Sequence, residues 1–330
     1  MYISAEPWRA QGAKPTSFMR AAGGKLTPMK MNRRDFTVSS LAFASGIRVV
    51  RGAPGKFKYA FCNESMKGMP WAEQCRLVSK AGYQGVEIAA FSLVKNDVSD
   101  LTPAVRRDML AAMRDNGLAC AGLHWLLVAP PAGLHCTTPD AALRKKSWDY
   151  IRSLVDFCGD LKGTVMVFGS PKQRNAQGIP VAQAIGYFTE GLRSVADHAQ
   201  SRGVRILIES LDKTQTDVVN TMSEAAKVVA AVNHPSIQTM FDFHNTLDEK
   251  EPFEVLIRKY FNLIRHIHVQ EMDGKYLGAG SGVKDFAKGF RTLKELGYDG
   301  WVSVEVFDFA PGPQKMAEES MKALRMLEQS

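Results

Sequence analysis

The chain has 330 residues, of which 45% are hydrophobic and 23% charged, a composition typical of a folded protein with a large core. Its net charge of +8 arises near the N-terminus, because residues 1–55 hold nine basic and two acidic residues. Residues 56–330 hold 33 basic and 32 acidic residues. A nearly neutral body argues against a nucleic-acid partner, since such affinity depends on clustered basic residues. No apolar run approaches the roughly 20 residues that span a membrane. The five scattered cysteines indicate neither a disulfide framework nor a structural zinc site.

Residues 1–55 are expected to form a disordered leader ahead of the folded domain. Arg33 and Arg34 precede a mildly apolar stretch at 36–47, and the run Arg-Arg-Asp-Phe resembles a twin-arginine export signal. This resemblance implies a protein that folds before export and is periplasmic. Two further arginines and the missing small-residue cleavage site leave open a disordered basic tail on a cytoplasmic protein.

From residue 57 onward, short apolar runs alternate with longer segments of helical period. Strands are expected at 58–62, 85–91, 119–125, 164–170, 205–210, 238–244, 265–271 and 301–307. Helices are expected at 71–81, 103–116, 140–161, 181–202, 221–232, 252–263, 283–296 and 314–328. Several helices are followed by a glycine suited to a left-handed cap, namely Gly82, Gly117, Gly203 and Gly297.

Eight strand–helix units predict a single α/β domain, a (β/α)8 barrel over residues 56–330. An open doubly wound sheet is the alternative, but its nucleotide-binding version would carry a Gly-x-Gly-x-x-Gly motif that does not follow the first strand. The barrel places its active site at the C-terminal ends of the strands.

Four consecutive predicted strands each carry one charged or metal-ligating residue near that end, namely Glu209, Asp242, His268 and Glu305. A buried carboxylate costs several kcal/mol unless it is paired or binds a metal. Three carboxylates converging with an imidazole would repel one another without a cation. The set therefore predicts a site for one divalent metal ion such as Mn, Co, Mg or Zn.

With these four residues, the His-x-His-x-x-Glu run and the final Ser-Val-Glu-Val-Phe strand, the chain resembles the xylose-isomerase-like barrel family. That family includes sugar and sugar-phosphate isomerases, tagatose and psicose 3-epimerases and hydroxypyruvate isomerase. The resemblance implies a (β/α)8 barrel, a metal held by all four residues, and Glu209 and Glu305 as the acid/base pair on either side of a sugar. Removing a proton beside a carbonyl creates an enediolate, whose negative charge a bound metal stabilises.

The chain departs from the pattern of the epimerases in two places. Those enzymes commonly carry Asp-x-x-His after the sixth strand, whereas this run continues to His244 and Asn245. His244 should point the same way as Asp242 if the strand continues through both, and so contact substrate or metal. Where the family has an arginine that binds substrate, this chain has Gly274, followed by Lys275. The missing arginine bears on which sugar the chain binds.

Several further residues are candidates for binding substrate around the mouth of the barrel. Glu87 and His124 near the ends of the second and third strands are expected to line the pocket, and Glu271 to orient the histidine or bind a hydroxyl. Lys172 and Arg174 either hold an anionic or hydroxylated substrate or are solvated. The candidates for substrate binding are therefore His244, Glu87, His124, Glu271 and Lys275. Trp125 is expected mainly to pack, with stacking on a sugar face as the alternative, and His266 to bond within the barrel rather than to metal.

The leading hypothesis is a metal-dependent sugar isomerase or epimerase. An alternative is a lyase that acts on keto-glycosides at the same site, because the enediolate can expel a leaving group instead of being reprotonated. An endonuclease-like phosphodiesterase needs more metal ligands than seven histidines offer at strand ends, and a non-catalytic sugar-binding module is a further alternative. The expected partner is a sugar or keto-glycoside, with neither nucleic acid nor a membrane span, and homo-oligomers are left open.

Overall fold

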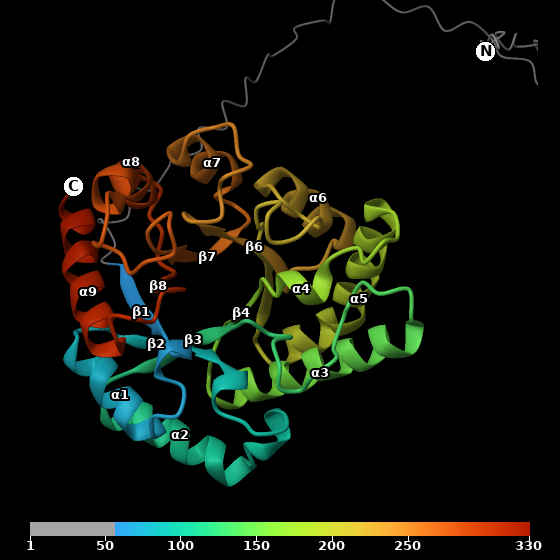
Figure 1. Cartoon of the computed structure of the whole chain (residues 1–330), viewed down its shortest axis with the longest axis horizontal. Coiled ribbons are helices and arrows are strands. Elements are labelled where there is room, and N and C mark those ends of the chain that lie inside the picture. The colour runs from blue at the N-terminus through green and yellow to red at the C-terminus, as the bar shows by residue number, and fades with distance from the viewer. Residues whose placement is uncertain (1–56) are drawn as a thin grey trace, which may run out of the picture. The chain divides into compact units, whose positions relative to one another are not determined.

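The computed structural model describes residues 57–330, which form a closed barrel of eight parallel strands surrounded by helices (Figure 1). The strands follow one another around the barrel in chain order, and β8 closes the ring by pairing with β1. The predicted (β/α)8 fold is therefore confirmed. The leader and its arginine pair lie outside the described residues, so export stays a prediction. Among residues 57–330, no helix is long and apolar enough to cross a membrane.

The elements agree closely with those expected from the sequence. The strands are β1 (Lys58–Cys62), β2 (Gly85–Ala89), β3 (Ala119–His124), β4 (Val165–Phe168), β5 (Arg205–Ile208), β6 (Ile237–Asp242), β7 (Ile264–Val269) and β8 (Trp301–Val304). The helices are α1 (Trp71–Lys80), α2 (Pro103–Asp115), α3 (Ala141–Asp160), α4 (Pro171–Arg174), α5 (Val181–Ser201), α6 (Met222–Val232), α7 (Phe253–Tyr260), α8 (Gly282–Glu295) and α9 (Pro313–Gln329). Three 3₁₀ turns, η1 (Glu64–Met66), η2 (Ala90–Ser92) and η3 (Val98–Asp100), and the short α4 lie in loops after strands and were not expected.

Most predicted strands extend too far toward their C-terminal ends. β5 ends at Ile208 and β8 at Val304, so Glu209 and Glu305 are the first residues beyond their strands. The apolar pattern runs past the last strand residue because the loops that follow are also buried. The four predicted cap glycines all have positive φ, as the left-handed helix caps require.

Strand alternation determines which side chains point into the barrel. Phe168 packs on Trp148 and Phe188 of the outer helices, with ring centroids 5.6 Å and 5.0 Å away. The side chains on the opposite face of β4, with neighbours from β5 and β6, form a separate apolar cluster of Val165, Val167, Leu207 and Met240. Asp242 stands two positions after Met240 within β6, so its side chain shares this inward direction. Glu209, the first residue after β5, meets Asp242 on the same side.

The contact between α3 and α5 depends on a glycine. A Cβ atom at Gly191 would lie 1.8 Å from Cε2 of Trp148, far closer than atoms can approach. We expect Gly191→Ala to lower the free energy of unfolding by at least the 1–3 kcal/mol typical of overpacking. Gly186 on the same helix has no such neighbour within 4 Å. Gly186→Ala should instead raise the free energy of unfolding by about 0.5–1 kcal/mol, and urea unfolding of both variants measures the contrast.

Candidate metal and active site

The structure brings the four predicted ligand residues together at the C-terminal end of the barrel. One ligand atom from each lies within 4.8 Å of the others, and all four side chains are buried. They come from four neighbouring strands or from the residue that follows: Glu209 after β5, Asp242 at the end of β6, His268 in β7 and Glu305 after β8. These four residues are called the quartet below.

Neighbouring side chains fix the orientation of both glutamates in the quartet. The amide nitrogen of Asn245 donates to Glu209 Oε1 at 3.1 Å and to Asp242 Oδ2 at 2.7 Å. The indole N–H of Trp125 donates a short hydrogen bond to Glu305 Oε1. A Cβ atom at Gly169 would lie 2.3 Å from Glu209 Oε2, so glycine is needed there to leave room for the carboxylate.

The imidazole of His268 is held between carboxylates. Its Nε2 donates to Glu87 Oε1 at 2.9 Å, and its Nδ1 faces the quartet, 3.1 Å from Glu305 Oε2. Glu87 also accepts a bond of 2.6 Å from His266 Nε2. This arrangement, in which one ring nitrogen bonds a carboxylate while the other faces a metal site, is common for metal-binding histidines. His266 bonds within the barrel, as expected.

Burial and mutual repulsion shift the acidity of the quartet. Burial raises the pKa of Glu209 well above its usual range, and the charges of Glu305 and Asp242 raise it further. Burial also raises the pKa of Asp242. Burial would lower the pKa of His268, but the carboxylates of Glu87 and Glu305 raise it well above its usual range. Without a cation, protons bound to these groups therefore offset part of the negative charge of the quartet.

The donor set fits a divalent metal ion. Three carboxylates and one imidazole nitrogen offer mainly hard oxygen ligands, as Mn²⁺ and Mg²⁺ prefer, and one nitrogen that suits Mn²⁺, Co²⁺ or Zn²⁺. A cation at their centre would also relieve the repulsion that raises the pKa of Glu209. The cluster is thus consistent with the single metal site that the sequence predicts.

Binding of a metal to the quartet is expected to release protons. The raised pKa values of Glu209, Asp242 and His268 mean that these groups hold protons more readily in the metal-free protein than free side chains do. The apparent affinity for Mn²⁺ should therefore fall as the pH drops from about 8 to about 5. Calorimetric titration in two buffers of different ionisation enthalpy measures the protons released. An affinity that is constant over this range would contradict the prediction.

A cavity of about 350 Å³ opens onto the quartet. Glu209 and Glu305 line it, whereas Asp242 and His268 do not. Its other walls include aromatic and amide residues, namely Trp125, Phe307, Gln173, Gln215 and Asn245, together with Lys172. Apolar surface with a few placed polar groups is typical of pockets for small molecules.

Trp125 has a role that the sequence prediction understated. It has φ of 51°, a left-handed conformation that is uncommon for a large side chain, and its ring stacks on Phe91 with centroids 5.8 Å apart. This backbone conformation turns the indole toward Glu305 and the cavity. Trp125 therefore packs, as expected, and also lines the site.

The structure places the predicted pocket residues Glu87 and His124 deeper than the pocket wall. Glu87 is completely buried beneath His268, to which it bonds. His124 is also buried, and its Nε2 bonds Glu64 Oε2 at 2.8 Å. Both side chains point into the barrel below the cavity because they lie within β2 and β3 rather than in the loops beyond.

The loop after β7 uses its polar residues for structure. The carboxylate of Glu271 accepts hydrogen bonds of 2.8 Å from the backbone N–H groups of Gly278 and Gly282, and so holds the start of α8. Lys275 is exposed and pairs with Asp273 at 2.7 Å. Neither Glu271 nor Lys275 lines the cavity described above. The structure therefore does not place them in the predicted contact with substrate.

His244 does not share the direction of Asp242, because β6 ends at Asp242 and the strand alternation stops there. Its ring bonds the backbone carbonyl of Glu271 at 3.0 Å and packs edge-on against Phe307. Asn245, three positions after Asp242, instead reaches the quartet and the cavity. Asn245 stands where the family pattern Asp-x-x-His has its histidine. This spacing from Asp242 is the sequence signal that could have identified Asn245 as a site residue.

Arg174 is neither solvated nor part of the cavity wall. Its guanidinium is completely buried and donates to the backbone carbonyls of Phe168 at 2.8 Å and Glu209 at 2.7 Å. Burial lowers its pKa to about 10, while the nearby Glu209 carboxylate opposes that effect, so the side chain is charged at neutral pH. Arg174 therefore fixes the backbone that carries Glu209.

We expect Arg174→Met to lower the free energy of unfolding by roughly 3–5 kcal/mol, because it leaves the buried carbonyls of Phe168 and Glu209 without their donor. Urea unfolding measures the change. The matched control is Lys172→Met, since Lys172 is exposed on the same short helix. A change of more than about 0.5 kcal/mol in that control would show that the segment itself, rather than the buried guanidinium, is sensitive.

Comparisons with known proteins agree with this geometry. Residues 75–327 match the profile of the xylose isomerase-like TIM barrel family. The ketose 3-epimerase of Arthrobacter globiformis is 26% identical over 238 residues, which cover 69% of this chain and 74% of that protein.

A crystal structure of a D-psicose 3-epimerase in the presence of D-fructose has a TM-score of 0.71 at 20% identity, covering 83% of this chain and 100% of the other. The 3-keto-D-glucoside 4-epimerase of Escherichia coli has a TM-score of 0.70 at 18% identity, with coverage of 83% and 100%. The two structures show the shared fold, and the distant homologues include ketose 3-epimerases.

Proposed function

Because the chain belongs to the xylose isomerase-like TIM barrel family, we propose that it is a divalent-metal-dependent epimerase or isomerase of a ketose or keto-glycoside. The observation that carries this proposal is the exposure of two quartet members to the cavity. Glu209 and Glu305 line the cavity, whereas Asp242 and His268 serve only the metal side. Two carboxylates that reach both a metal and a substrate pocket suit proton transfer at a carbon beside a carbonyl.

The chain's own residues have separate parts in this reaction. One glutamate of the pair removes the proton from the carbon beside the carbonyl, and the other returns a proton to that carbon or its neighbour. Asn245 holds Glu209 and Trp125 holds Glu305, so each carboxylate keeps its position while it changes protonation state. A divalent cation in the quartet would stabilise the negative charge of the enediolate by several kcal/mol.

The two glutamates differ in acidity, which suits opposite roles. Burial and the charges of Glu305 and Asp242 raise the pKa of Glu209. Burial also acts to raise the pKa of Glu305, but the charge of His268 and its hydrogen bond bring that pKa below the usual value. Environments that shift the pKa values of two carboxyl groups in opposite directions are typical of acid/base pairs.

A lyase that acts on keto-glycosides is the second candidate. The E. coli structure described above is a 3-keto-D-glucoside 4-epimerase, so a similar barrel is found in a protein named for a keto-glycoside. The same enediolate would expel a leaving group at the β position if no acid returned the proton in time. The two candidates share every residue of the quartet and differ in the product.

The test is incubation of the Mn²⁺-loaded protein with a panel of free ketoses and keto-glycosides in D2O, followed by NMR of the products. An epimer or isomer with solvent deuterium at one carbon supports the proposal. A released aglycone together with an unsaturated sugar supports the lyase instead. If no compound in the panel exchanges a carbon-bound proton although the metal is present, the barrel is better explained as a sugar-binding module.

A further inference from the structure

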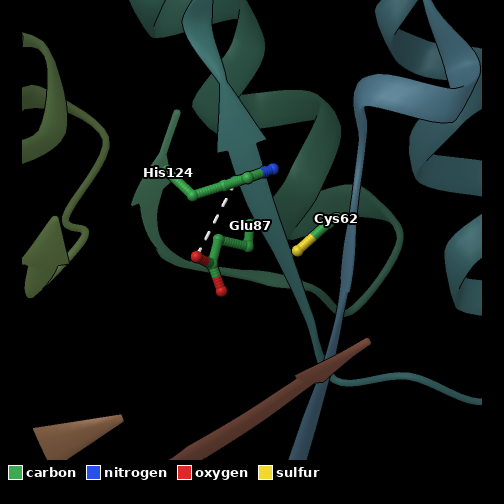
Figure 2. Close-up of side chains that lie close together, drawn as sticks. All are labelled: Cys62, Glu87 and His124. Carbon is green, nitrogen blue, oxygen red and sulfur yellow. Dashed lines mark ion pairs between the residues drawn. The ribbon is translucent and has the colours of Figure 1, made fainter. Parts of the chain in front are cut away.

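We propose that Cys62, Glu87 and His124 form a second metal site, suited to Zn²⁺, inside the barrel below the quartet. Figure 2 shows the three side chains gathered together, with the Cys62 sulfur directed toward Glu87. They come from the neighbouring strands β1, β2 and β3. One ligand atom from each lies within 4.8 Å of the others, and all three residues are buried.

His124 is arranged as a metal-binding histidine. Its Nε2 faces Glu64 Oε2 at 2.8 Å, so this nitrogen carries a hydrogen and donates it to the carboxylate. Its Nδ1 is buried, has no hydrogen-bond partner within residues 57–330, and stands 3.7 Å from Glu87 Oε1. A histidine whose Nε2 donates its hydrogen to a carboxylate has a lone pair on Nδ1 that can bind a metal.

The charge inside this half of the barrel also favours a second cation. Five buried carboxylates belong to the two sites or bond their ligands, namely Glu64, Glu87, Glu209, Asp242 and Glu305. One divalent ion in the quartet and the guanidinium of Arg174 together neutralise three of these negative charges. Two negative charges then remain and the Cys62 thiolate would add a third, so a second divalent ion would offset two of these three. Buried charges that stay uncompensated are costly.

The donor set separates the new site from the quartet. The quartet offers no sulfur, whereas Cys62 adds a thiolate to one imidazole nitrogen and one carboxylate oxygen. Zn²⁺ binds all three donor types, and a soft sulfur ligand selects against Mg²⁺ and Mn²⁺. On binding, the Cys62 thiol loses its proton to water and the sulfur forms the bond to zinc, with no change of oxidation state.

Glu87 connects the two sites. Its Oε1 accepts the N–H of His268, whose other nitrogen faces the quartet. The inward side chains two positions before Glu305 and His268 are polar as well, namely Ser303 and His266. The apolar cluster of Val165, Val167, Leu207 and Met240 therefore lies beside β4 to β6, whereas buried polar side chains from β2, β7 and β8 lie on the side of the second site.

The test is titration of the metal-free full-length protein with Co²⁺, a visible substitute for Zn²⁺, followed by absorption spectroscopy. Wild-type protein should bind two equivalents, one of which produces a thiolate-to-cobalt charge-transfer band in the near ultraviolet. Cys62→Ala should abolish the band and bind one equivalent. The matched control Cys75→Ala removes another buried cysteine, on α1, and should keep both the band and the stoichiometry.

Asp242→Asn separates this site from the quartet. It should weaken binding to the quartet while the charge-transfer band persists, whether or not the protein epimerises a sugar. The proposal is overturned if wild-type protein shows no such band at saturating Co²⁺, a result that does not depend on the folding of any variant. It is also overturned if the band survives Cys62→Ala.

Discussion

Replacement of Glu209 or Glu305 by glutamine is expected to lower the turnover of the metal-loaded protein by about 10²–10⁴-fold, the range typical for loss of a general acid or base. Glutamine keeps the size of the side chain and its contact with the cavity but cannot accept the proton from carbon. Both variants should fold, because Asn245 and Trp125 can still bond the amide oxygen at these positions. Formation of the epimer or isomer at saturating Mn²⁺ measures the loss.

The control for these variants is Glu190→Gln, because Glu190 is exposed on α5 and belongs neither to the quartet nor to the cavity wall. Its turnover should equal that of the wild type. The two-glutamate mechanism would be refuted if either quartet variant retained wild-type turnover with its metal bound. His244 would then be the next candidate base, although its ring bonds the carbonyl of Glu271.

Asp242→Asn is expected to act through the metal rather than through proton transfer. Asp242 belongs to the quartet but does not line the cavity. Loss of its charge should weaken Mn²⁺ binding by at least the 10–100-fold that loss of a residue supporting a metal ligand costs. Excess Mn²⁺ should then restore part of the turnover, which it cannot do for the glutamine variants. Titration calorimetry and turnover over a range of Mn²⁺ concentrations measure the two effects.

The exposed Asp108 on α2 gives the matched control, and Asp108→Asn should change neither the Mn²⁺ affinity nor the turnover. An Asp242→Asn variant that binds Mn²⁺ as tightly as the wild type would remove Asp242 from the metal site. A variant that binds tightly and is also inactive would instead place Asp242 in the proton transfer.

The sequence predicted the barrel and the quartet because both depend on local regularities. Buried strands appear as short apolar runs, and a charged residue near the end of such a run stands out. Leu207 and Glu209 show how this works, since the period of two places both side chains inside the barrel. Four consecutive strands each carry one quartet member near or just after the strand end, so the convergence of the four follows once the barrel is assumed.

The residues around the quartet could not be predicted in the same way. His244 was expected to follow Asp242 inward, but that inference needed a strand that continues past Asp242, and the structure ends it there. Trp125 reaches Glu305 only because its backbone is left-handed, which no apolar pattern reveals. Arg174 bonds main-chain carbonyls of Phe168 and Glu209, groups that carry no side-chain signal.

The cysteines illustrate a different limit of sequence reasoning. Their irregular spacing indicated no structural zinc site, because zinc motifs are recognised by ligands that are close in the sequence. Cys62, Glu87 and His124 are far apart in the chain, yet successive strands of a barrel bring them side by side. Spacing alone cannot reveal such a cluster.

The most direct test of the proposed function is deuterium wash-in at the reacting carbon, measured by NMR in D2O for the Mn²⁺-loaded wild type and for Glu209→Gln and Glu305→Gln. Metal content is determined for the same samples. We predict rapid wash-in for the wild type and a loss of about 10²–10⁴-fold in both variants when saturating Mn²⁺ keeps the metal content of the three samples equal. Wash-in that persists at the wild-type rate in both variants would contradict proton transfer by the two glutamates.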